Sequence, residues 1–197
     1  MPRVLLQATL VAFNDEDLIS RFAAYVTNVP YLLAAGLLGA VLATRSKHGM
    51  AMGIVLLFNS VVSATLKRVL HGEITRRPDD SFLDGKGMPS HHAMFVLCFS
   101  VLLFRVYRNW LARLLSLAVS FLVCWSRVYL GVHTTPQVAA GMLLGAFVGA
   151  VFPLDRLPLC QLHALAERLL QQSPSNSASE SDEQKVRMTN TFHTKSL

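Results

Sequence analysis

The chain has 197 residues, of which 52% are hydrophobic and 15% are charged, and its formal net charge is +6 at pH 7. Charged residues make up about 25% of an ordinary soluble domain, so the composition argues against a water-soluble fold and favours a chain embedded in a bilayer. Because the basic residues lie in short segments at the ends of apolar runs, the positive charge does not indicate a nucleic-acid partner. This length predicts a single domain.

Residues 1–28 are predicted to form an interfacial segment. The first apolar stretch carries one arginine, and no small-residue cleavage site follows it, so it is not a clear secretory signal. The acidic run "NDED" comes next. Asn14 can cap a helix whose first turn carries Asp15, Glu16 and Asp17, which complements the positive end of the helix dipole. We therefore expect a helix over about 15–28 that leads into the membrane.

Five apolar runs follow and predict membrane helices. They are Val29–Ala43, Met50–Leu66, Ala93–Phe104, Trp110–Trp125 and Val138–Pro153. A straight span needs about 20 mostly apolar residues; the second, fourth and fifth runs reach this with their flanks, and the third could instead be a helix buried inside a bundle. The predicted fold class is all-α, a polytopic membrane bundle of about five transmembrane helices with short interfacial helices. The transmembrane domain would cover residues 29–156.

The C-terminal part divides into two predicted segments. Leu159, Leu162, Leu165 and Leu169 recur three or four residues apart, which predicts an amphipathic helix over 157–172, either interfacial or packed on the bundle. The polar, low-complexity stretch 173–197 predicts a disordered tail. Three cysteines without regular spacing argue against a disulfide framework and against a zinc cluster.

Basic residues in alternate connections predict an orientation. They are Arg45 and Lys47, then Arg105, Arg108 and Arg113, then Arg156 and Arg168. The positive-inside rule makes this side cytoplasmic. Three polar segments then share the opposite face, namely 66–80, "PSHH" at 89–92 and "SRVYLGVHTTPQ" at 126–137.

The three polar segments predict a site for an anionic ligand. Lysines and arginines that converge at one face favour phosphate, and the helix start at "PSHH" adds free amides and a favourable dipole. His92 and His133 come from different helices and could supply a nucleophile and a general acid. A metal site built from His91, His92 and His133 is the alternative, although no carboxylate or thiolate stands with them. Arg68 and Arg76 suit headgroup anchors, and Ser90 could be only an N-cap.

Together these segments resemble the phosphatidic acid phosphatase type 2 superfamily, whose signature has three blocks. The first is a lysine followed after six residues by Arg-Pro, and the second is Pro-Ser-Gly-His. The third is Ser-Arg with a histidine six positions on and an aspartate four further. The second and third blocks match, with His91 in place of glycine and Gln137 in place of aspartate. The first block has two or three extra residues between Lys67 and Arg77. "GMPSHH" and "SRVYLGVHTTPQV" are similar to the dolichyl-diphosphatase branch, and the resemblance covers about residues 15–155.

This resemblance implies hydrolysis of dolichyl diphosphate, a polyisoprenoid diphosphate lipid, to dolichyl phosphate and inorganic phosphate. The site would face the lumen of the endoplasmic reticulum, would recycle the carrier for N-glycosylation and would need no metal cofactor. His133 would form a phosphohistidine and His92 would protonate the leaving group. The remaining implied ligands of the phosphoryl oxygens are Lys67, Arg77, Arg127, Ser90 and the amides near His91.

Gln137 follows His133 by four residues, so its side chain can reach back and orient the imidazole. His91 and His92 point about 100° apart on a helix, so one phosphate cannot meet both rings equally, and we expect His91 to offer its amide. Two other functions stay open. One is another lipid phosphatase of the superfamily, acting on phosphatidate or a bacterial-type polyprenyl diphosphate. The other is a non-catalytic membrane protein that binds anionic lipid or carries anions.

Overall fold

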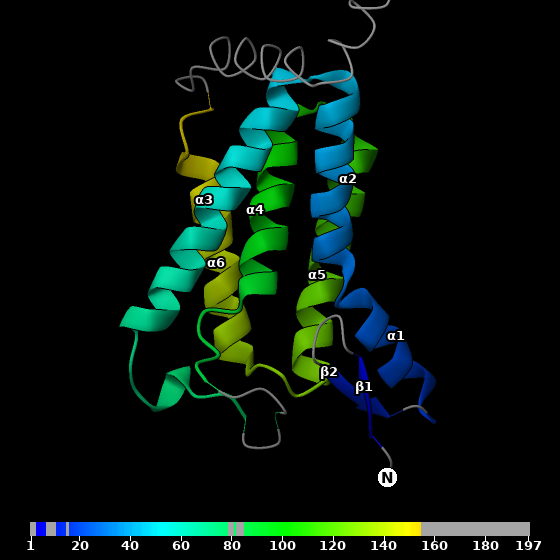
Figure 1. The fold of residues 1–197 in the computed structure, drawn as a ribbon, viewed down its shortest axis with the longest axis vertical. Coiled ribbons are helices and arrows are strands. Elements are labelled where there is room, and N and C mark those ends of the chain that lie inside the picture. Colours follow the sequence, from blue (N-terminus) through cyan, green and yellow to red (C-terminus); the bar gives the residue numbers. More distant parts are fainter. Residues whose placement is uncertain (1–2, 7–10, 15, 79–80, 82–84, 155–197) are drawn as a thin grey trace, which may run out of the picture. The chain divides into compact units, whose positions relative to one another are not determined.

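The computed structural model describes residues 3–6, 11–14, 16–78, 81 and 85–154. The amphipathic helix predicted at 157–172 and the disordered tail predicted at 173–197 therefore lie outside the described residues. The described chain contains a short β-hairpin followed by helices that run alternately up and down (Figure 1).

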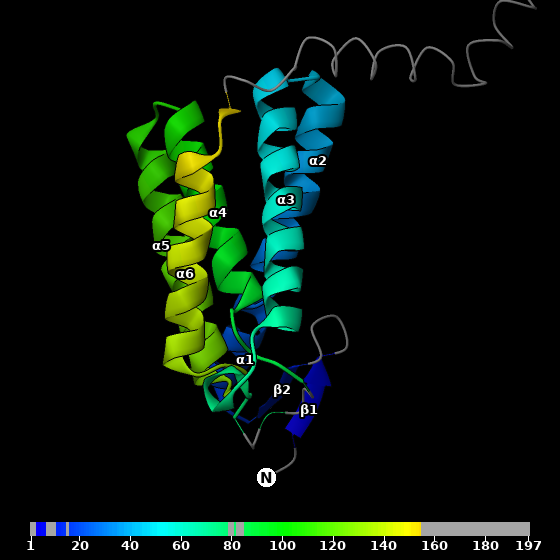
Figure 2. The same ribbon diagram turned by 90° about the vertical axis from the view of Figure 1, so that its left-hand side faces the viewer.

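Five long helices lie side by side and form the bundle (Figures 1 and 2). They are α2 (Val29–Thr44), α3 (Lys47–Val69), α4 (His91–Val106), α5 (Trp110–Tyr129) and α6 (Thr135–Val151). The predicted all-α membrane bundle is confirmed, and each helix begins and ends within a few residues of the run that predicted it. A 3₁₀ turn, η1 (Glu73–Thr75), interrupts the long connection between α3 and α4.

Helix α4 lies at the centre of the bundle and contacts α3, α5 and α6. Its closest neighbour is α6, on which Gly141, Gly145 and Gly149 recur every fourth residue and form one face. A Cβ added to Gly141 would lie 2.6 Å from the carbonyl oxygen of Ser90, and one added to Gly145 would collide with the carbonyl of Met94. Glycine is required on this face because the two backbones approach so closely.

Apolar side chains cover much of the outside of the bundle. Leu32, Leu57, Leu114, Leu143 and Phe147 are all more than half exposed. The apolar stretches Leu18–Thr44, Lys47–Val69 and Trp110–Tyr129 have 27, 23 and 20 residues and are long enough to cross a membrane. Exposed apolar surface on this scale requires a lipid surround, so the chain is a multi-pass membrane protein. The central α4 has 16 residues, as few as α2, and it is largely buried, as the alternative for the third run anticipated.

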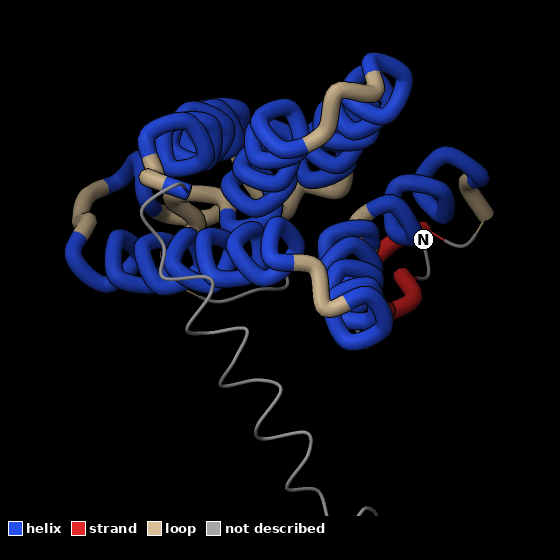
Figure 3. Tube along the Cα trace, turned by 90° about the horizontal axis from the view of Figure 1, so that it is seen from above, coloured by secondary structure: helices blue, strands red, loops and turns tan. Residues whose placement is uncertain are grey.

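The N-terminal segment differs from its prediction. Strands β1 (Arg3–Leu6) and β2 (Val11–Asn14), red in Figure 3, pair as an antiparallel hairpin. Asn14 ends β2, so the expected cap at Asn14 is wrong. The cap is Asp17, whose carboxylate accepts from the backbone N–H groups of Ile19 and Ser20 at 3.0 and 3.2 Å. Helix α1 then runs over Leu18–Val26.

Candidate active site

The three predicted segments meet at one end of the bundle. Helices α3 and α5 end there and α4 and α6 begin there, beside η1 (lower part of Figures 1 and 2). Since neighbouring helices alternate in direction, every second connection must lie at this end. The alternation brings residues that are up to 70 positions apart into one polar region within an otherwise apolar molecule.

Arg127 lies in the last turn of α5, and its side chain is only 2% exposed. Its Nη1 donates to Thr27 Oγ1 at 2.9 Å. The buried Nε has no hydrogen-bond partner among the described residues. A buried guanidinium with an unused donor is costly unless an anion is available to accept from it, so Arg127 is poised to bind an oxyanion.

Arg77, rather than Arg76, faces the site. Arg77 Nη1 donates to the carbonyl of Val132 at 3.1 Å, and its buried Nε has no partner in the described part of the chain. The Arg76 side chain is 73% exposed and lies 4.0 Å from the carboxylate of Glu73. The 3₁₀ turn η1 lies between Lys67 and Arg77 in this longer first block. Burial lowers the pKa of Arg77 from its ordinary value.

Lys67 completes the basic cluster from the last turn of α3. It lies within electrostatic range of Arg77, Arg127 and His91. Three cations that repel one another at short range favour a multiply charged anion between them. Arg68, one residue further on, is exposed, and its carbonyl accepts from Lys86 Nζ at 3.1 Å.

His133 and Gln137 form a hydrogen-bonded pair at the start of α6. His133 Nδ1 lies 3.2 Å from Gln137 Oε1, and the two side chains are 3% and 0% exposed. Gln137 Nε2 donates to the carbonyls of Ile74 and Arg76 at 3.1 and 2.6 Å. These two acceptors fix the orientation of the amide, so its oxygen must face the imidazole. His133 therefore carries its proton on Nδ1, and Nε2 has the free lone pair.

Gln137 ties together the three segments of the site. Its side-chain oxygen also accepts from the Thr134 backbone N–H at 3.3 Å, and its backbone carbonyl accepts from the Ser90 N–H at 3.1 Å. Gly87 packs on the side chain so closely that any Cβ there would collide with the amide. Gln137 thus contacts the first segment through η1, the second through Gly87 and Ser90, and the third through His133.

Burial, followed by the charges of Arg127 and Arg77, lowers the pKa of His133 to about 3. The hydrogen bond to Gln137 acts in the opposite direction and is outweighed. The imidazole is consequently neutral at pH 7, which is the form that a nucleophile requires.

The "PSHH" segment presents His92 beside His133. The two imidazoles interact electrostatically, and the buried His92 Nε2 has no hydrogen-bond partner in the described ranges. The His91 ring stands nearly perpendicular to that of His92, with centroids 6.4 Å apart. Ser90 occupies the N-cap position of α4, but its buried Oγ caps nothing and is also without a partner within the described residues. The unused polar atoms of Ser90 and His92 are available to a ligand.

Two residues of the site were missed from the sequence. Thr27 holds Arg127, and the Tyr31 ring lies edge-on to His92 with centroids 5.6 Å apart. Both come from the corner between α1 and α2, where the only sequence signal is a pair of polar residues in an apolar stretch. Among the described residues, no group of three His, Cys, Asp or Glu side chains could hold a metal ion.

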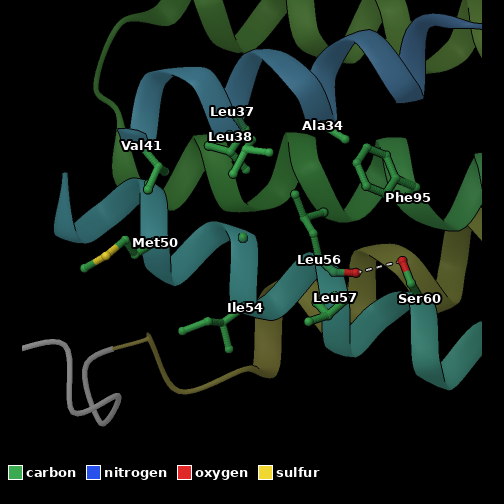
Figure 4. Close-up of a pocket in the computed structure, with 12 residues that line it drawn as sticks. Ala34, Leu37, Leu38, Val41, Met50, Ile54, Leu56, Leu57, Ser60 and Phe95 are labelled. Carbon is green, nitrogen blue, oxygen red and sulfur yellow. Dashed lines mark hydrogen bonds between the residues drawn. The ribbon is translucent and has the colours of Figure 1, made fainter. Parts of the chain in front are cut away.

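An apolar groove of about 440 Å³ lies between α2 and α3 (Figure 4). Ala34, Leu37 and Val41 line it from α2, and Met50 and Leu57 line it from α3. Phe95 of α4 also lines it (Figure 4), and Phe95 follows His92 by three residues, less than one helical turn. Phe95 is thus the lining residue nearest along the chain to the polar site, and the other lining residues belong to the membrane-spanning helices α2 and α3.

The sequence of this chain matches the PAP2 superfamily over residues 31–157. The chain belongs to that superfamily. The matched range contains His92, His133, Gln137 and the basic cluster, and it excludes Thr27. The resemblance stated from the three segments is thereby confirmed.

Curated relatives fall into two groups. The chain is 28% identical over 163 residues to a protein from Saccharomyces cerevisiae named dolichyldiphosphatase, covering 73% of this chain and 66% of the yeast protein. It is 30% identical over 157 residues to human dolichyldiphosphatase 1, with 71% and 66% coverage. It is also 29% identical over 168 residues to lipid phosphate phosphatase gamma of Arabidopsis thaliana, with 76% and 73% coverage. The chain thus spans slightly under two thirds of the yeast and human relatives, and all three names describe phosphatases.

A crystal structure of a transmembrane PAP2-type phosphatidylglycerolphosphate phosphatase from Bacillus subtilis has a similar fold. The TM-score is 0.55 at 23% sequence identity, over 66% of this chain and 73% of that chain. The similarity shows that the two chains share the arrangement of their helices.

Proposed function

We propose that this protein hydrolyses dolichyl diphosphate to dolichyl phosphate and inorganic phosphate. The observation that carries the proposal is the meeting of three cations and two histidines at one end of an apolar bundle. Arg77 and Arg127 each keep a buried Nε without a partner in the described chain, and His133 is a neutral imidazole held by Gln137. The names of the yeast and human relatives support the choice of substrate.

The proposed reaction has two steps. His133 Nε2 attacks the terminal phosphorus, forming an N–P bond as the bond to the bridging oxygen breaks, and His92 gives its proton to the departing dolichyl phosphate. His92 then accepts a proton from water, whose oxygen attacks the phosphohistidine and releases inorganic phosphate together with neutral His133. The imidazolium formed at His133 during attack keeps its Nδ1–H bonded to Gln137. Both steps use one nucleophile and one acid–base group.

The cations supply most of the catalysis in this proposal. Charge builds up on the equatorial oxygens during phosphoryl transfer, so donors fixed in advance stabilise the transition state more than the ground state. Lys67, Arg77 and Arg127 would hold these oxygens, with Ser90 Oγ and the free amides at the start of α4 completing the cradle. We assign His91 an amide contact, because its ring is turned nearly perpendicular to that of His92.

The apolar groove between α2 and α3 suits the hydrocarbon part of such a substrate. An isoprenoid chain carries no polar groups, and the groove is lined almost entirely by apolar side chains, including Phe95 three residues after His92. Burying each methylene of a lipid chain contributes about 0.8 kcal/mol. The groove supports a lipid substrate without distinguishing an isoprenoid from an acyl chain.

We place the enzyme in the endoplasmic reticulum membrane with the site facing the lumen, where it would recycle the lipid carrier of N-glycosylation. The basic connections at the opposite end of the bundle support this orientation through the positive-inside rule. The location of the reaction follows from the substrate and from the names of the relatives.

A second candidate is a phosphatase of broader lipid specificity that also accepts phosphatidate. The similarity to lipid phosphate phosphatase gamma favours it. The two candidates share the proposed chemistry and differ only in the lipid.

Phosphate release by the purified protein in detergent, with a chelator present, tests the proposal. Dolichyl diphosphate, a shorter polyprenyl diphosphate and phosphatidate are compared at equal surface concentration, with His133→Ala as the control. A kcat/KM at least about tenfold higher for dolichyl diphosphate supports the first candidate, and a preference for phosphatidate supports the second. Absence of phosphate release from all three lipids by a well-folded protein contradicts both.

A further inference from the structure

Thr27 lies at the corner between α1 and α2 and is completely buried. It precedes the part of the chain that matches the PAP2 superfamily, which begins at Tyr31. Its hydroxyl nevertheless contacts α5, 99 and 100 positions further along the chain, at Ser126 and Arg127.

The hydrogen bonds of Thr27 can run in only one direction. Arg127 Nη1 can only donate, so Thr27 Oγ1 accepts from it at 2.9 Å. Ser126 Oγ donates its proton to the carbonyl of Val123 at 2.7 Å, so it can only accept from Thr27, 3.4 Å away. The chain therefore runs from Arg127 through Thr27 and Ser126 to Val123, and each hydroxyl both donates and accepts.

Further contacts hold the same corner against the site. Tyr31, one turn after Thr27, places its ring edge-on to His92 and lies within electrostatic range of Arg127. At the other end of α1, the carboxylate of Asp17 accepts from the hydroxyl of Tyr129 on α5 at 3.0 Å. Helix α1 is thus attached to the end of α5 at both of its own ends, through Thr27 to Ser126 and Arg127 and through Asp17 to Tyr129.

We infer that Thr27 is a positioning residue for the phosphate site: it fixes the Arg127 guanidinium so that Nε and the second amino group face the oxyanion. Without the Thr27 oxygen, Nη1 would be buried without an acceptor, and the guanidinium would turn to find one. The inference rests on the proposed role of Arg127 in binding phosphate. It adds a residue outside the matched family range to the machinery of the site.

Thr27→Val is the direct test, because valine keeps the shape and removes the hydroxyl. Thr27→Ser keeps the hydroxyl and should rescue the site. Thr44→Val is the matched control, since the Thr44 hydroxyl donates to Ala40 of its own helix at the opposite end of α2. Each full-length protein is purified in detergent. Orthovanadate and inorganic phosphate affinities are measured by calorimetry, and kcat, KM and the melting temperature are measured alongside.

We expect Thr27→Val to weaken orthovanadate binding by about 10- to 100-fold, the size of effect that leaving one charged donor unpaired produces. Thr27→Ser should stay within about threefold and Thr44→Val within about twofold of wild type. In a double-mutant cycle, Thr27→Val should have little further effect in an Arg127→Lys background. Should Thr27→Val fail to fold, Thr27→Cys, a weak acceptor of nearly the size of serine, replaces it and is compared with Thr27→Ser.

Equal orthovanadate affinities in Thr27→Val and wild type would overturn the inference, as would equal losses in Thr27→Val and Thr27→Ser, which would indicate packing alone. A wild-type protein that releases no phosphate and binds neither anion refutes the proposed function itself. A wild-type protein that does both, with Thr27→Val unchanged, refutes only the role of Thr27.

Discussion

At the end of the bundle where α4 finishes, Arg105 and Arg113 donate to backbone carbonyls of the protein itself. Arg105 Nη1 donates to the carbonyls of Gly149 and Phe152 at 2.9 and 2.8 Å, in the last turn of α6 and at its C-cap. Arg113 donates to the carbonyls of Tyr107 and Phe104 at 2.8 and 2.6 Å, where α4 ends. At the end where α4 begins, Arg77 and Arg127 each bond to one protein oxygen and keep a buried Nε without a partner among the described residues.

The contrast shows how partners, rather than residue type, separate structural from ligand-binding arginines. Helix C-termini leave carbonyls that need donors, and Arg105 and Arg113 supply them. The beginnings of α4 and α6 leave N–H groups and a positive dipole, to which an arginine adds only repulsion unless an anion is present. The end with unsatisfied polar groups is therefore the end at which we propose that the phosphate binds, and each prediction below probes one side of this contrast.

The largest effect is expected for the two histidines. His133→Ala and His92→Ala should each lower kcat by at least about 10³-fold, or about 4 kcal/mol of barrier, because each removes one partner of a two-step covalent mechanism. Initial rates on dolichyl diphosphate and the melting temperature of each variant check this. A folded His133→Ala protein that retains more than about a tenth of wild-type activity would remove the assigned nucleophile.

Arg77→Ala should lower kcat/KM by about 10²- to 10³-fold, as expected for a donor to the transition state. Arg76→Ala should change it by less than about threefold, because the Arg76 side chain is exposed and its ion pair with Glu73 is at the surface. The pair of neighbours is a matched comparison within one loop. Equal losses in the two variants would mean that the long first segment shifts the register of the loop.

Gln137→Ala should lower kcat by about 10- to 100-fold, similar to the loss of an orienting partner at a metal site. The imidazole loses its acceptor, and the carbonyls of Ile74 and Arg76 lose their donor. The rate and the melting temperature should therefore fall together. A normal rate in Gln137→Ala would show that His133 is oriented without this contact.

The Gln137→Glu variant separates orientation from charge. A carboxylate next to His133 stabilises imidazolium, so the pKa of His133 should rise from about 3 toward its ordinary value. Protonated His133 cannot attack, so activity in this variant should fall as the pH is lowered through the new pKa, whereas the wild type should show no His133 limb above about pH 4. The carboxylate also faces the carbonyls of Ile74 and Arg76 and cannot donate to them, so the melting temperature should drop. A pH–rate profile that matches the wild type would exclude contact between residue 137 and the nucleophile.

The sequence predicted the helices and most of the site because both depend on local patterns. Apolar runs located α2–α6, and alternation of the helices placed Lys67, His92 and His133 at one end. The sequence also favoured Arg77 over Arg76 as the phosphate ligand, and in the structure Arg77 Nε is buried while the Arg76 side chain is exposed. Thr27 and Tyr31 were missed because a single hydroxyl or ring in an apolar stretch has no period, and its partner lies 61 to 100 positions away. The cap at Asp17 was misplaced by three residues because the acidic run offers several equivalent caps and the hairpin that occupies Asn14 is not apparent from composition.

The smallest effect on activity is expected at the end of the bundle away from the site. Arg105→Met keeps the aliphatic length of the side chain and removes the donor to Gly149 and Phe152, so two carbonyls at the end of α6 lose a charged partner. The protein should lose about 1–3 kcal/mol of stability, seen as a lower melting temperature in detergent, while kcat and orthovanadate affinity stay within about twofold of wild type.

Arg108→Met is the control, because Arg108 is exposed in the same connection and donates to no carbonyl within the described chain. The Arg108→Met variant should melt like the wild type. If Arg105→Met lowered kcat as strongly as Arg77→Ala without lowering the melting temperature, the two ends of α4 would be functionally coupled. The division of arginines into structural and ligand-binding groups by their partners would then fail.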